Sequence, residues 1–210
     1  MEKAYKNLGY IFLLLIPMAI LAFYKSYLVK SPLNNDRIDG YIHFHAVVAA
    51  MWVILLISQP LLLRYKQFKA HRLLGKISYL IFGLLVLSFL PLIQRTYSDF
   101  ASSINPIMDL LLLLIFYPLA IKNKKKVTVH MRYMIAVTLI FIGPTVARIL
   151  SHYTSVGNYW GPLITWGCIP LILSGLIIWD KKNGRNYRPY LLALGGFTIY
   201  FVLVFINLKP

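Results

Sequence analysis

The sequence predicts an all-α integral membrane protein, a bundle of seven transmembrane helices with the N-terminus in the cytoplasm and the C-terminus outside. The composition is the first observation behind this prediction, because the 210 residues are 59% hydrophobic and include only six acidic residues. The second is that the apolar residues fall in blocks about as long as the hydrocarbon core of a bilayer is thick.

The predicted spans follow one another with short connections. The first begins after a basic N-terminal segment and ends in aromatic residues, which is typical of an interfacial anchor and not of a cleaved signal peptide. We expect spans at approximately Leu8 to Leu28, Ile42 to Leu63, Leu73 to Gln94, Pro106 to Ile121, Val129 to Leu150, Pro162 to Trp179 and Tyr190 to Ile206. These occupy nearly the whole chain, so we expect a single domain, 1–210.

The basic residues predict the orientation. Most of the 22 Lys and Arg residues lie in the N-terminal segment and in the second, fourth and sixth connections, which places those segments at the cytoplasmic side. The formal charge of +16 does not indicate nucleic-acid binding, because the bases are spread over loops that border apolar spans. Attraction to the anionic inner leaflet explains them, and the lipid bilayer is the partner that we expect.

The second span carries a polar helical stripe that predicts a face turned into the bundle. His45, Trp52 and Gln59 fall at intervals that place them on one side of a helix. His43 would project about 200° away from His45 if the helix already includes it. Either His43 precedes the first turn and both imidazoles converge on one ion, or only His45 faces inward.

The fourth and fifth spans each contribute one charged residue near the predicted outer side. Asp109 is the only acidic residue deep in an apolar span, and Arg148 is its best available partner. Two interpretations compete. The residues either form an ion pair that joins two helices, or Asp109 is a metal ligand and Arg148 lies beside the metal.

These residues together predict a transition-metal site at the outer face, because imidazole and carboxylate groups are common ligands of Zn(II) and Cu(II). Arg148 and Trp52 would support this site without binding the metal. The candidate ligands are His43, His45, Asp109 and His152.

Two further histidines lie near the predicted inner face, where the third and fifth spans begin. His71 and His130 are the minimum for bis-imidazole ligation of b-type haem. Arg72 or Arg132 would then pair with the propionates. The alternative is that both histidines contact lipid headgroups.

The polar positions resemble those of a group of small, uncharacterised multi-pass membrane proteins of bacteria. The resemblance implies that these positions matter and that the protein lies in the bacterial inner membrane, but it implies no reaction. It covers roughly Tyr41 to Arg148 and is carried by His45, Trp52, Gln59, His71-Arg-x-x-Gly75, His130-x-Arg132-x-Met134, Pro144 and Arg148.

Three functional classes agree with these patterns. The first, which we favour, is a redox or metal-handling protein with copper or zinc at the outer site and haem b at the inner one, including a membrane oxidoreductase with an electron-transfer or small-molecule partner. The second is a non-enzymatic solute transporter or assembly factor. The third is a zinc-dependent hydrolase, resembling alkaline ceramidases and adiponectin receptors. The last span lacks the His-x-x-x-His pair of those hydrolases.

Overall fold

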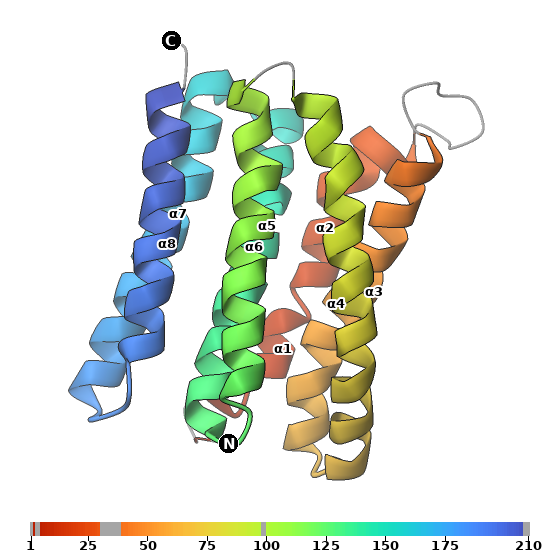
Figure 1. Cartoon of the computed structure of the whole chain (residues 1–210). Coiled ribbons are helices and arrows are strands. Elements are labelled where there is room, and N and C mark those ends of the chain that lie inside the picture. The colour runs from red at the N-terminus through yellow and green to blue at the C-terminus, as the bar shows by residue number, and fades with distance from the viewer. Residues whose placement is uncertain (1, 3–4, 30–38, 98–99, 208–210) are drawn as a thin grey trace. The chain divides into compact units, whose positions relative to one another are not determined.

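The protein consists of helices that are long and apolar enough to cross a membrane. Its structure, a computed structural model, describes residues 2, 5–29, 39–97 and 100–207. Seven candidate spans lie within these residues, which confirms the predicted fold class (Figure 1). The protein is therefore embedded in a lipid bilayer, where helices satisfy their own backbone hydrogen bonds. The spans are Leu8–Leu28, Gly40–Arg64, Phe68–Thr96, Phe100–Lys122, Val127–Tyr153, Trp160–Lys182 and Arg188–Asn207.

The chain divides into two compact units, Met1–Thr96 and Tyr97–Pro210. The single domain expected from the sequence stays a prediction. Unit 1 contains α1 (Leu8–Phe12), α2 (Leu15–Phe23), the π-helical η2 (Tyr24–Leu28), α3 (Gly40–Arg64) and α4 (Phe68–Thr96). Unit 2 contains α5 (Phe100–Lys122), α6 (Val127–Tyr153), α7 (Gly157–Lys182) and α8 (Arg188–Asn207).

In unit 1, α3 packs along α4 on one side and against α1 on another. The centre of the α3–α4 contact is Trp52, which is 1% exposed and lies 6.0 Å from the ring of Phe82 between ring centroids. The sequence stripe that predicted an inward face through Trp52 is thus confirmed at this position.

Local signals fix both ends of α3. Asp39 precedes the helix, and its carboxylate accepts hydrogen bonds from the backbone N–H groups of Tyr41 and Ile42, so the helix begins two residues before the predicted Ile42. At the other end Lys66 has a positive φ of 58°. The N–H groups of Lys66 and Gln67 donate to the carbonyls of Leu63 and Leu62, which closes the helix in a Schellman turn.

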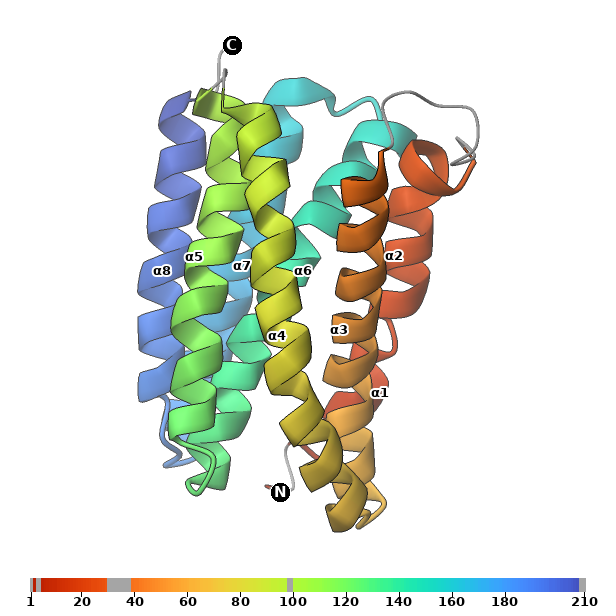
Figure 2. The ribbon, with the colours of Figure 1, turned by 45° about the vertical axis from the view of Figure 1, so that its right-hand side comes forward.

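Unit 2 is a four-helix arrangement in which consecutive helices pack together, and α8 also packs against α5 and α6 (Figure 2). Its apolar centre contains fully buried side chains from α5 and α8, among them Leu113, Phe116 and Phe197. The small residue Gly196 lets α8 approach α5, because a Cβ at this position would lie 2.8 Å from a methyl group of Leu112.

Two helices in unit 2 begin earlier than the approximate starts of the predicted spans. We expected spans to begin at Pro106 and Pro162, but α5 begins at Phe100 and α7 at Gly157. A proline removes one N–H donor near a helix start without breaking the helix when neighbouring groups satisfy the freed carbonyl. Pro106 and Pro162 therefore lie within the first two turns of their helices and do not mark the helix starts.

A buried ion pair joins three helices at one end of unit 2. Nε of Arg132 in α6 donates to Asp180 of α7 over 2.7 Å, and both side chains are fully buried. Nη1 of Arg132 donates to the carbonyl of Thr128 over 2.9 Å. The guanidinium also lies 5.8 Å from the ring centroid of Tyr190 in α8, within cation–π range.

The turn after α7 completes this network. Gly184 has a φ of 63°, a left-handed conformation that glycine adopts without steric cost. The turn lets the N–H of Arg185 donate to the carbonyl of Asp180 over 2.8 Å. It also brings the Arg185 guanidinium to 3.9 Å from the Asp180 carboxylate.

Removal of one charge from this pair should destabilise unit 2 strongly. We expect Asp180→Leu to lower the free energy of unfolding by about 3–5 kcal/mol, because Arg132 is left charged and buried. The double variant with Arg132→Met should recover most of the loss, since no unpaired charge remains. Unfolding followed by circular dichroism in detergent measures both, and Lys181→Ala is the exposed control. Equal stability of the Asp180→Leu variant and the control would contradict the assignment.

Candidate functional site

His130 is oriented by the end of the preceding helix. Its Nδ1 lies 2.8 Å from the carbonyl oxygen of Ala120, which is among the last four carbonyls of α5 and has no helical partner further along. A carbonyl only accepts, so Nδ1 carries the proton and donates. In the neutral ring, Nε2 then carries the lone pair that binds a metal.

His71 shows the same arrangement in unit 1. Its Nδ1 lies 3.3 Å from the carbonyl oxygen of Gln59 in α3, and the Gln59 amide Nε2 donates to the backbone carbonyl of His71 over 3.3 Å. The two residues therefore hold the start of α4 against α3. Here again Nδ1 is the donor and Nε2 carries the lone pair.

His45 reaches the same tautomer through a serine. Its Nδ1 lies 2.9 Å from Oγ of Ser88 in α4. The single hydroxyl proton of Ser88 is donated to the carbonyl of Leu85 over 2.6 Å, so Ser88 accepts from His45. The edge of the imidazole also meets the ring of Phe89, with 5.2 Å between ring centroids. His45 is thus fixed with Nδ1 protonated.

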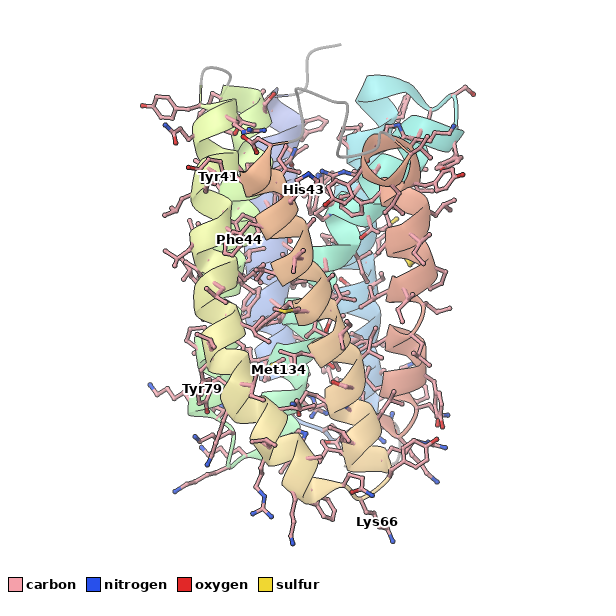
Figure 3. All side chains as sticks on the ribbon, turned by 90° about the vertical axis from the view of Figure 1, so that its right-hand side faces the viewer. Tyr41, His43, Phe44, Lys66, Tyr79 and Met134 are labelled. Atoms are coloured by element: carbon pink, nitrogen blue, oxygen red, sulfur yellow. The ribbon has the colours of Figure 1, made fainter. Side chains whose placement is uncertain are left out.

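His43 points to a different element. It lies inside α3, and its Nδ1 is 2.7 Å from the hydroxyl of Tyr27 in η2. Of the two alternatives for this pair, the structure has the helical one, in which His43 and His45 face different partners. Figure 3 shows His43 and Phe44 on different sides of α3.

Asp109 lies in the interior of unit 2. It is 5% exposed, and its Oδ1 has no hydrogen-bond partner among the described residues. Arg148 acts on this carboxylate through its charge, and Tyr200 lies beside it. The Tyr200 hydroxyl donates to the carbonyl of Asn105 over 3.1 Å, and the centroid of its ring lies 3.9 Å from that of Trp166, with the rings tilted by 30°. The Asp109–Arg148 ion pair and the metal-ligand role of Asp109 both stay predictions.

The remaining candidate residues have separate surroundings. His152 lies in the last turn of α6. Arg72 is exposed and donates from Nε to the carbonyl of Phe68 over 3.3 Å. Arg132, which we expected at the haem propionates, is instead fully buried in its pair with Asp180.

The predicted ligand sets are divided between the units. His43, His45 and His71 belong to unit 1, and Asp109, His130 and His152 to unit 2. Within the described ranges, no three or more His, Cys, Asp or Glu side chains lie together in a way that could hold a metal ion. The four-ligand outer site and the bis-histidine haem site therefore stay predictions.

Three residues of these networks were missed from the sequence. Asp180 stands directly before Lys181 and Lys182, and no partner was predicted for it from the sequence. Ser88 lies within an apolar span and Tyr27 is one of the aromatic residues that end the first span, and neither position indicates a histidine partner in the sequence.

The comparisons with known proteins add no relative: no protein-family model, no curated protein and no solved structure matches this chain. The site must therefore be interpreted from its own geometry.

The hydrogen bond to Ser88 should fix the tautomer of His45. In ¹⁵N-histidine NMR spectra we expect one set of His45 ring resonances, with Nδ1 protonated, and a mixture of tautomers in Ser88→Ala because the acceptor is lost. Ser78→Ala is the matched control, since Ser78 also donates to the carbonyl three residues earlier but lies about 15 Å away along α4. Identical His45 spectra for both variants would contradict this assignment.

Proposed function

We propose that this protein is a membrane metalloprotein whose histidines bind haem b or a transition metal, and that it acts in electron transfer or metal handling. The observation that supports it is the shared state of His45, His71 and His130. Each donates from Nδ1 to a fixed acceptor within its own unit.

This state is the one that metal-binding histidines adopt. Such residues almost always donate their second ring N–H to a carbonyl or another acceptor, which fixes the ring and raises the basicity of the ligating nitrogen. A free imidazole must lose rotational freedom when it binds a metal. In this protein the three imidazole rings have already lost that rotational freedom on folding, because their hydrogen-bond acceptors are helix carbonyls or a buried serine.

For haem, His71 and His130 are the proposed ligands. Bound haem would supply one-electron transfer. Because the Arg132 guanidinium is already paired with Asp180, we assign the propionate contact to Arg72, whose side chain is exposed near His71. Bidentate pairing of a guanidinium with a carboxylate suits this role.

For copper or zinc, His45 is the leading ligand of the predicted outer set, with Asp109, His152 and His43 as the other proposed members. The donor chemistry suits either metal, since neutral imidazole and carboxylate are ligands of both. By resemblance to the bacterial group, we place the protein in the inner membrane.

A small-solute transporter is the second candidate. Asp109 favours it, because a buried carboxylate with an unpartnered oxygen next to Arg148 is a costly arrangement inside a membrane and commonly marks a solute or ion path. This function requires no bound metal, which separates it from the first proposal.

The decisive experiment measures metal content and the absorption spectrum of detergent-purified protein prepared without chelators. We expect near-stoichiometric iron with a haem Soret band, or copper. Loss of haem is expected in His71→Gly and in His130→Gly but not in the matched variant His43→Gly. Added imidazole should restore haem binding to the two deficient variants, because it occupies the vacated ligand position.

The alternatives give different results. Zinc without a Soret band would support the hydrolase class. Absence of iron, copper and zinc would contradict the metalloprotein proposal and favour the transporter. Haem that persists in both His71→Gly and His130→Gly would exclude these residues as its ligands.

A further inference from the structure

A groove lies on the surface of unit 1, where α3 begins beside the second half of α4. It encloses about 450 Å³ and is lined by Asp39, Gly40, Tyr41, Phe44, Leu87 and Pro91. Tyr41, Phe44 and Leu87 are all exposed. Figure 3 shows Tyr41 and Phe44 near one end of α3, far along the bundle from Tyr79. In a membrane-embedded helix pair, such side chains meet lipid.

The rim of the groove carries two opposite charges. Arg95, near the end of α4, forms an ion pair with Asp39, and their side chains are 40% and 37% exposed. Asp39 is fixed further by its two hydrogen bonds from the backbone of Tyr41 and Ile42. A positive and a negative group are thus held side by side where the apolar wall ends.

This pattern matches a zwitterionic phospholipid. A guanidinium recognises phosphate by bidentate hydrogen bonds, and a carboxylate accepts from an ammonium group. The aromatic ring and hydroxyl of Tyr41 suit the boundary between acyl chains and headgroups. Gly40 leaves room at the rim, because no described atom lies within 4 Å of the position that a Cβ would occupy.

We propose that this groove binds one molecule of phosphatidylethanolamine. Its phosphate contacts Arg95, its ammonium contacts Asp39, and one acyl chain lies along Phe44, Leu87 and Pro91. The primary ammonium distinguishes this lipid from phosphatidylcholine, which has no N–H donor. The carboxylate of Asp39 disfavours phosphatidylglycerol, which has no cationic group. This site does not depend on metal or haem binding.

The test uses the full chain reconstituted in vesicles of equal phosphatidylethanolamine and phosphatidylglycerol, extracted in mild detergent and examined by native mass spectrometry. We expect one retained phosphatidylethanolamine per chain in preference to phosphatidylglycerol. Arg95→Gln should reduce this retention by about tenfold, because it removes the charged phosphate contact. The control Lys76→Gln, at an exposed cationic position of the same helix, should not.

Arg95→Gln also removes the ion pair with Asp39 and so can weaken the fold. A second variant therefore tests the groove without changing either charge. Leu87→Trp fills the groove without touching either charge and should also abolish retention, whereas Tyr79→Trp, at another exposed position of α4, should not. Equal retention in Leu87→Trp and Tyr79→Trp would overturn the proposal. A preference for phosphatidylglycerol, or retention of a quinone in place of phospholipid, would overturn it as well.

Discussion

A polar group inside a bilayer must find its partner within the protein, because lipid tails offer none. This constraint determines where the buried polar residues of this protein lie. Arg132 and Asp180 neutralise each other between α6 and α7, with Tyr190 of α8 over the guanidinium. The same requirement explains why His45 faces a hydroxyl group and His130 a carbonyl group, since an imidazole N–H left unpaired there would cost more than the bond itself contributes.

The hairpins α3–α4 and α5–α6 supply a hydrogen-bond partner for a histidine in the same way, although they lie in different units. In each, a proline lies near the end of the first helix, at Pro60 and Pro118, and a short basic turn follows. The second helix then presents a histidine, His71 or His130, to a carbonyl of the first. Shared backbone geometry, and not a fixed ligand motif, is what makes these two residues comparable.

Much of the fold follows from the sequence alone, since seven apolar blocks of bilayer length leave few other structures. The differences are local. The carboxylate cap of Asp39 extends α3 by two residues, and Pro106 and Pro162 lie inside helices because proline is tolerated there.

The site was less predictable, for a physical reason. Spacing along one helix places His45 on the face of Trp52, but it cannot show that Ser88 of another helix accepts from its ring. Likewise, Arg132 near a predicted inner face is a reasonable propionate partner until Asp180, far along the chain, is found beside it. Contacts between helices depend on rotation and depth, which one sequence does not encode in a readable pattern.

The histidine contacts join residues that are close together in the sequence. His71 and Gln59 are 12 residues apart, and His130 and Ala120 are 10 apart, so each bond closes a small loop between consecutive helices. Contacts of this kind form quickly and do not need the rest of the chain. Each imidazole can therefore take its orientation once its own pair of helices has formed, without a contact from later helices.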